Sequence, residues 1–146
     1  MDIYTDGSCL RNPGGKGGWA VVTDTGVEMY GGELSSTNNR MELQAVIAAV
    51  TYILDNDLKD VTIFTDSQYV CKGVMEWMDG WFQKNRLSHK SKNPVKNPEM
   101  WSLMRQLRNN ANINGTPFVV KWVRGHSGIP LNERADVLAN LGAVSC

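Results

Sequence analysis

The chain has 146 residues, of which 42% are hydrophobic and 21% are charged, and its 15 basic residues balance its 15 acidic ones. This composition is ordinary for a globular domain that buries about two thirds of its unfolded surface. The sequence has no apolar run long enough to cross a membrane, which excludes a membrane-spanning protein. The N-terminus lacks a signal-peptide pattern, and Cys9, Cys71 and Cys146 have no metal-like spacing. We therefore expect reduced thiols and a cytoplasmic location, with no membrane partner.

The first part of the chain predicts three strands and a long helix. Strand patterns cover residues 1–6, 17–24 and 27–34, and the tight turn at 24–26 favours an antiparallel hairpin between the second and third strands. The spacing of apolar residues then changes to that of a helix, which is predicted over residues 36–56, where apolar side chains from Leu43 to Leu54 form one stripe.

The rest of the chain alternates strands and helices. A strand is predicted over 61–65, and a helix opens near Ser67. Residues 76–98 predict a short helix that runs into an exposed loop, followed by a helix over 99–109, a strand over 118–123 and a helix over 132–143. This order predicts an α/β fold with one mixed sheet, antiparallel at first and parallel later, and helices on its faces. Without a linker or repeat, we expect residues 1–146 to form a single domain.

The neutral total hides a local excess of positive charge. Between Lys84 and Arg108 there are seven basic residues and one acid, Glu99, which is a balance of +6. Such a protrusion suits a polyanionic partner, and a solvated polar loop is the alternative explanation.

Four acids occupy unusual positions. Asp6 and Asp66 each lie at the end of a predicted strand, just before a turn or a helix, where open α/β sheets commonly place their chemistry. Glu42 lies in the apolar stripe of its helix, and Asp136 shares a helix face with alanines. Carboxylates on packed faces are costly unless a cation or hydrogen bonds compensate them.

Each acid also has a local explanation. Asp66 could cap the following helix, Glu42 could form a capping box with Asn39, Asp136 could be an exposed helix charge, and Asp6 could be a turn residue. Together, however, the four acids are the oxygen ligands that Mg²⁺ or Mn²⁺ selects, and no His/Cys cluster points to zinc. Paired hard cations roughly 4 Å apart serve in-line displacement at phosphorus.

Four motifs occur in a characteristic order over essentially the whole chain: "YTDGSC", "TNNRMEL", "TDSQYV" and "GHSGIPLNERADVLA". The chain resembles type 1 ribonucleases H in these motifs. The resemblance implies a five-stranded mixed sheet with helices on both faces. It also implies an endonuclease that cuts the RNA strand of RNA/DNA hybrids with two Mg²⁺ ions, leaving 5′-phosphate and 3′-hydroxyl ends; Mn²⁺ is a possible substitute.

By this resemblance, Asp6, Glu42, Asp66 and Asp136 hold the two ions, and Asp6 is the shared ligand. One ion would activate the attacking water and the other would stabilise the leaving 3′ oxygen. His126, in the loop "RGHSG", matches a mobile histidine assigned to proton transfer or product release.

The resemblance also implies substrate contacts. Small amide and hydroxyl side chains suit recognition of the RNA 2′-hydroxyl, which is both donor and acceptor. The implied minor-groove residues are Cys9, Asn12, Asn38, Asn39, Gln68 and Asn132. Thr37 and Asn97 match a pocket for a phosphate of the DNA strand. The implied handle for the DNA backbone, at about residues 81–97, contains Trp77 at its edge, Trp81, Lys84, Arg86, Lys90, Lys92 and Lys96.

Departures from the family pattern are few. Arg11 stands where many relatives carry a small residue, and Phe82, Gln83 and Leu87 interrupt the cations of the handle. We expect weaker affinity and a gentler salt dependence, because each neutralised phosphate contributes about 0.9 to the log–log slope. The chain otherwise resembles a minimal catalytic domain, expected to be monomeric.

Three other functions share parts of this pattern. A phosphotransferase with an aspartyl nucleophile would want a second acid at position 8, where the chain has Ser8. A non-catalytic hybrid-binding module would typically have lost an acid, and another nuclease or integrase of the same fold would differ at "TNNRMEL" and in the handle.

Overall fold

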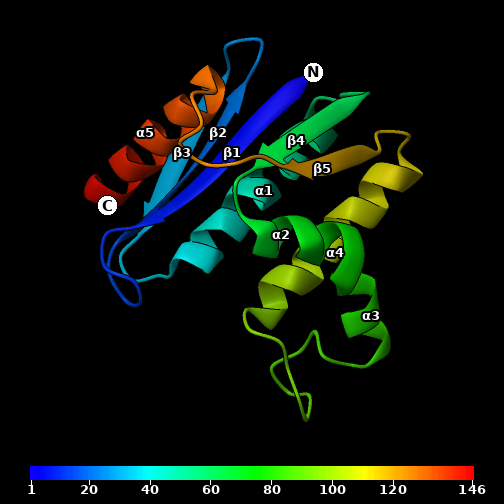
Figure 1. Ribbon diagram of the computed structural model, residues 1–146. Coiled ribbons are helices and arrows are strands. Elements are labelled where there is room, and N and C mark those ends of the chain that lie inside the picture. Colours follow the sequence, from blue (N-terminus) through cyan, green and yellow to red (C-terminus); the bar gives the residue numbers. More distant parts are fainter.

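The computed structural model describes all 146 residues. Five strands form one mixed sheet in the order β3-β2-β1-β4-β5 (Figure 1). They are β1 (Asp2–Cys9), β2 (Gly17–Thr23), β3 (Glu28–Glu33), β4 (Val61–Thr65) and β5 (Phe118–Trp122). Neighbouring strands are antiparallel from β1 to β3 and parallel from β1 through β4 to β5. The predicted α/β fold is therefore confirmed.

Helical segments connect the strands. They are α1 (Asn38–Asp55), α2 (Gln68–Lys72), the π-helical turn η1 (Gly73–Trp77), α3 (Met78–Gln83), α4 (Pro98–Ile113) and α5 (Pro130–Val144). The last two begin earlier than the sequence predicts because Pro98 and Pro130 occupy the first helical turn, where a backbone N–H has no partner in the helix. None of the helices is long and apolar enough to cross a bilayer.

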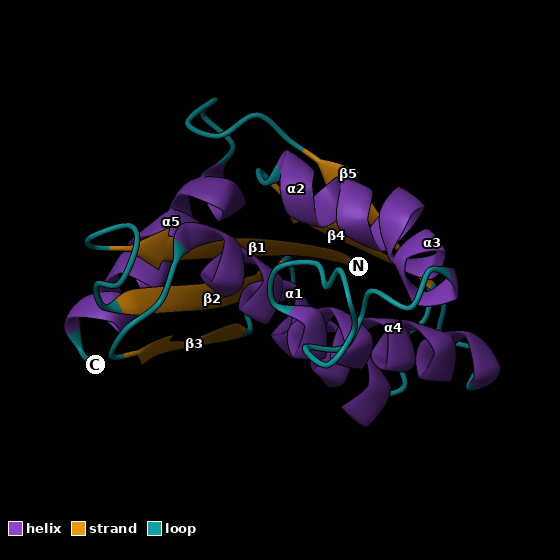
Figure 2. Ribbon diagram, turned by 90° about the horizontal axis from the view of Figure 1, so that it is seen from below, coloured by secondary structure: helices purple, strands orange, loops and turns teal.

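Alternate residues of the sheet pack against different helices. Ile3 and Val21 join a 17-residue core cluster that contains the apolar stripe of α1. Ala20 and Val22, which point to the opposite face of β2, pack on Ala135 and its neighbours in α5. The sheet is thus covered on both faces, with α1 and α4 side by side on one of them (Figure 2).

Trp101 of α4 fixes the part of the molecule that carries the aromatic and basic residues. Its ring is fully buried, its Nε1–H donates to the Tyr69 hydroxyl at 2.9 Å, and the Trp81 ring meets it edge-on at 5.2 Å. A Cβ at Gly73 would lie 2.1 Å from the Trp101 ring, so η1 requires glycine there. The segment that joins α3 to α4 projects away from the sheet (Figure 1).

The close approach of α5 to β2 also depends on a glycine. A Cβ at Gly18 would lie 1.9 Å from the carbonyl oxygen of Ala139, a backbone atom that no side-chain rotation moves away. Gly18 therefore sets how closely α5 lies on the sheet.

We expect Gly18→Ala to lower the free energy of unfolding by about 3 kcal/mol or more, because the added methyl group must displace α5. The matched control is Gly80→Ala in α3, where the added Cβ meets nothing within 4 Å. This control should raise stability by about 0.5–1 kcal/mol through helix propensity. Urea unfolding measures both changes, and equal effects of the two substitutions would contradict the packing argument.

Candidate active site

Asp6 and Asp66 are brought together by the parallel pairing of β1 with β4. Tyr4 lies opposite Phe64 in this pair, so the two acids, each two residues further along, reach the same level of the sheet on the same face. The rings of Tyr4 and Phe64 stack behind them at 4.8 Å between centroids.

Glu42 reaches the same place from α1. Single carboxylate oxygens of Asp6, Glu42 and Asp66 lie within 4.8 Å of one another. Gly7 makes this approach possible, because a Cβ there would lie 2.2 Å from the backbone nitrogen of Glu42. The missing side chain therefore lets the start of α1 settle against β1 and places Glu42 beside Asp6.

Asp136 and His126 lie at the margin of this cluster. Asp136 is half-buried on α5 and lies close enough to raise the pKa of both Asp6 and Asp66, but it is outside the group of three. His126 is exposed in the loop between β5 and α5, where its positive charge acts to lower the pKa of Asp66.

The local explanations for the acids are wrong. Ser67 caps α2 by accepting from the Val70 N–H at 3.1 Å, and Thr37 caps α1 by accepting from the Arg40 N–H at 3.1 Å, so neither Asp66 nor Glu42 is the capping residue. Asp6 lies within β1 and is buried, rather than in a turn. Asp136 is half-buried and not an exposed charge.

The buried carboxylates repel one another. Burial, followed by the charges of Asp66 and Asp136, raises the pKa of Asp6 to about 8. Burial and the charges of Asp6 and Asp66 raise the pKa of Glu42 well above its ordinary value, and burial followed by repulsion from Asp136 raises the pKa of Asp66.

No ion pair compensates these charges. None of the ion pairs in the structure involves one of the four acids. Glu42 Oε2 is buried without a hydrogen-bond partner. An orphaned carboxylate oxygen in a set of oxygen-only donors fits a hard divalent cation such as Mg²⁺ or Mn²⁺.

A cleft of about 730 Å³ lies beside the acids rather than among them. It contains the predicted phosphate-binding residues Thr37 and Asn97, together with Asn12, Asn38 and Asn39. Because Glu42 follows Thr37 by five residues of one helix, it lies about 7.5 Å further along the helix axis. One wall of the cleft and one of the acids are thus held on the same helix.

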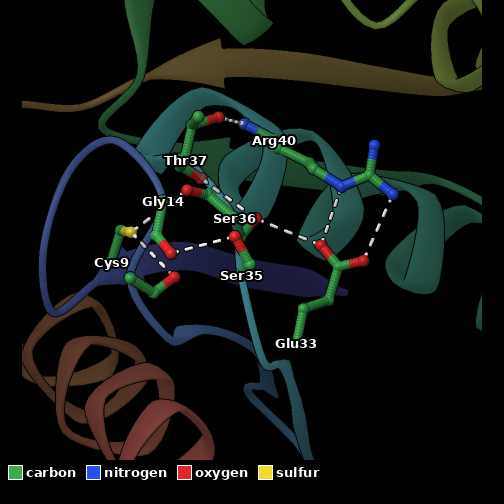
Figure 3. A network of polar contacts seen from close by, with 8 residues as sticks. Cys9, Gly14, Glu33, Ser35, Ser36, Thr37 and Arg40 are labelled. Carbon is green, nitrogen blue, oxygen red and sulfur yellow. Dashed lines mark hydrogen bonds and ion pairs between the residues drawn. The ribbon is translucent and has the colours of Figure 1, made fainter.

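A polar network fixes the approach to this cleft (Figure 3). Arg40 donates to both carboxylate oxygens of Glu33, at 2.7 and 3.2 Å, and the Ser36 hydroxyl donates to the same carboxylate at 3.1 Å. The thiol of Cys9 lies 3.0 Å from the Arg11 carbonyl and 3.5 Å from those of Gly15 and Ser36. Cys9, predicted as a groove residue, thus points at backbone carbonyls of the loop that follows it and of Ser36.

The basic stretch from Lys84 to Arg108 has fewer available cations than its composition suggests. Arg105 and Arg108 both pair with Asp79, at 2.9 and 2.6 Å, whereas the handle lysines form no ion pair. Trp77 is 41% exposed, and Trp81 is half-buried against Trp101. Leu87, expected from the sequence to interrupt the cations of the handle, is instead buried and belongs to the core.

The remaining predicted contact residues divide by exposure. Asn12, Asn38, Asn39 and Gln68 are exposed, whereas Asn132 is 3% exposed and its Oδ1 is buried without a partner. Sequence reasoning missed Tyr69 and His89, which also line the cleft. His89 stands among lysines in "SHKSK", a context that drew attention only to net charge.

Known proteins share this architecture. The family model for RNase H matches residues 1–144. The ribonuclease H of Hahella chejuensis is 49% identical over 145 residues, which cover 97% of this chain and 92% of that protein. The crystal structure of LC9-RNase H1, a type 1 RNase H with the type 2 active-site motif, covers 99% of this chain and 72% of its own, with a TM-score of 0.80 at 31% identity. RNase H1 from the archaeon Halobacterium salinarum NRC-1 covers 99% of this chain and 98% of its own, with a TM-score of 0.67 at 26% identity.

The sheet order and the carboxylate cluster define an α/β nuclease fold with a site suited to hard cations. The full-length family match goes further, and the chain belongs to the ribonuclease H family, whose members are hydrolases that act as nucleases.

The raised pKa values predict an unusual dependence of stability on pH. Without divalent cations the folded protein retains a proton on Asp6 that the unfolded chain releases, so the free energy of unfolding falls as pH rises from 3.8 to about 8. Asp6→Asn removes this charge, and we expect it to stabilise the metal-free protein by roughly 1–3 kcal/mol at pH 7 and by almost nothing at pH 4. Urea unfolding in EDTA at both pH values measures the difference.

The control is Asp57→Asn, an exposed acid at positive φ, where asparagine is well tolerated. Its effect should be small and similar at both pH values. A stabilisation by Asp6→Asn that does not grow with pH would contradict the repulsion described above.

Proposed function

We propose that this protein is an endonuclease that hydrolyses the RNA strand of RNA/DNA hybrids. The observation that carries the proposal is the convergence of Asp6, Glu42 and Asp66 within 4.8 Å, without a cationic partner, in a chain of the ribonuclease H family. Residues 1–146 would act as one catalytic domain whose basic handle spans about 81–97.

The four acids would hold two divalent cations, with Mg²⁺ as the natural ion and Mn²⁺ as a substitute. When bound, such a pair supplies Lewis-acid activation of a water and neutralises charge at the leaving oxygen, giving 5′-phosphate and 3′-hydroxyl ends. The fit rests on the orphaned Glu42 Oε2 and on the raised pKa values, because a bound cation would offset the repulsion among the carboxylates.

His126 would move protons at the edge of the site. Its loop position leaves the imidazole exposed to solvent, and its charge acts to lower the pKa of Asp66. This placement supports a role in protonating the leaving group or in product release, and the exposed loop lets the ring move between the site and solvent.

Substrate contacts would divide between the two strands. Asn12, Asn38, Asn39 and Gln68 offer exposed amides beside the acids for the 2′-hydroxyl and the base edges of the minor groove, and Cys9 and Asn132 would support this surface from within. On the DNA strand, Thr37 and Asn97 would bind a phosphate in the cleft. Further along that strand, Trp77 and Trp81 would meet the sugars, and Lys84, Lys90 and Lys92 the phosphates.

The decisive experiment compares labelled RNA/DNA, RNA/RNA, DNA/DNA and single-stranded RNA, each with Mg²⁺ and with EDTA. We expect cleavage of the RNA strand of the hybrid alone, and only with the metal.

Asp66→Asn should bind the hybrid as wild type does but lower kcat by a factor of about 10³ or more, because the site loses a charge at the reacting phosphate. Wild-type turnover by this variant would disprove the metal assignment.

The handle makes a separate prediction. Changing Lys84, Lys90 and Lys92 to Gln should raise KM and reduce the slope of log KM against log salt by about 2–3, because up to three phosphate contacts are lost. The value of kcat should change little, since these side chains lie outside the acid cluster. Lys59→Gln, at the opposite end of β4 from Asp66, is the control and should alter neither quantity. An equal fall in kcat would assign the handle a role other than binding.

A further inference from the structure

His89 stands at the wall of the cleft that contains Thr37 and Asn97. It belongs to the exposed segment between α3 and α4, and with Lys96 it faces the start of α1 across the cleft. On its other side His89 lines a second hollow, which it shares with Glu99. The imidazole therefore separates a candidate phosphate site from a carboxylate.

The carboxylate engages one particular ring nitrogen. Nδ1 of His89 contacts Oε1 of Glu99, in the first turn of α4. The hydrogen bond from His89 lowers the pKa of Glu99, so this carboxylate is ionised near neutral pH and can only accept. The neutral imidazole must therefore carry its hydrogen on Nδ1.

This tautomer determines which ring nitrogen is available to a ligand in the cleft, and whether that nitrogen can donate a hydrogen bond. Glu99 lines the hollow and not the cleft, and its carboxylate engages Nδ1, so Nε2 is the ring nitrogen that would be available to a ligand in the cleft. In the neutral ring Nε2 has a lone pair and no hydrogen, and it would oppose the lone pairs of a phosphate oxygen. Protonation turns Nε2 into a charged donor, which is the stronger kind of phosphate ligand.

The charged groups around His89 make this change count. The cleft contains one permanent cation, Lys96, and the phenol of Tyr69 from α2. Lys90, which follows His89 in the chain, lines the second hollow. Glu99 is the only acid that lines the cleft or the second hollow. A proton on His89 would double the positive charge that the cleft walls present.

We propose that His89 is a further substrate-binding residue, a phosphate ligand of the DNA strand that takes up a proton when the hybrid binds. This inference rests on the proposed function, since it takes the cleft as the DNA-phosphate site. Glu99 acts through His89 as a positioning residue, because it fixes the tautomer that makes the contact depend on the proton.

The test measures the Kd of a fluorescent RNA/DNA hybrid in EDTA, where nothing is cleaved, for wild type and His89→Asn between pH 5.5 and 8.5. The acid cluster titrates alike in both proteins, so the ratio of the two Kd values isolates His89. We expect the variant to bind about fivefold more weakly at pH 5.5 and within about twofold of wild type at pH 8.5. A ratio that does not change with pH would overturn the proposal.

Two further variants separate charge from structure. His89→Lys carries a permanent cation, so at pH 8.5 it should bind about fivefold more tightly than wild type does at the same pH. Glu99→Gln frees the tautomer, so its own Kd should depend less on pH than the wild-type Kd does. Failure of His89→Lys to tighten binding at pH 8.5, or an unchanged pH dependence in Glu99→Gln, would count against the mechanism.

The position of the contact is tested with neutral methylphosphonate linkages placed one at a time in the DNA strand. One linkage should abolish the advantage of wild type over His89→Asn at pH 5.5, whereas the same linkages in the RNA strand should leave it intact. An advantage that survives every DNA linkage would disprove the phosphate contact. If wild type does not bind the hybrid at all, the proposed function fails, whereas normal binding with a constant ratio rejects only the role of His89.

Discussion

The repulsion among buried carboxylates at the ends of β1 and β4 is the constraint on which this structure depends. Three of these groups share a volume that has no protein cation, and a fourth adds its charge from α5. Such a cluster opposes folding, so the rest of the chain must hold it together. The two hydrophobic clusters on opposite faces of the sheet do so by fixing α1 and α5 against the strands that carry the acids.

The acids are not used as helix caps or in ion pairs, because neighbouring residues perform these local structural functions. Thr37 and Ser67 cap the helices, and each stands close in sequence to an acid that could otherwise have been held at a helix end. Arg40 forms its ion pair with Glu33, and it forms none with the nearby acid Glu42. The result is a set of carboxylates whose only unmet requirement is positive charge, and the family of this chain is one in which a divalent cation meets it.

Much of this could be predicted from the sequence, because periodicity records which face each residue turns to the core. The order of strand and helix patterns predicted the mixed sheet with helices on its faces, and the apolar stripe of α1 predicted the odd position of Glu42. Side-chain pairing over long distances leaves no such periodic record. The burial of Leu87 depends on where α4 lies, and the carboxylates that pair with Arg105 and with His89 are set by folded geometry. Cations of one basic stretch therefore differ in role: Arg105 is neutralised by Asp79, whereas Lys90 forms no ion pair.

The separation of charge explains how a protein of zero net charge can suit a polyanion. The acids are concentrated where cations would gather, and the unpaired lysines lie on a segment that leaves the sheet and is anchored by Trp81 and Leu87. In the proposed function, a phosphate backbone bound by the lysines would continue toward the cleft at the start of α1, and the carboxylates would repel it until cations are bound. In the proposed function, metal loading and substrate binding would be coupled through charge, because cations at the acids would remove the repulsion that opposes the approach of the RNA strand. Because α1 carries both the cleft residue Thr37 and Glu42, any shift of that helix would disturb both halves of the site together.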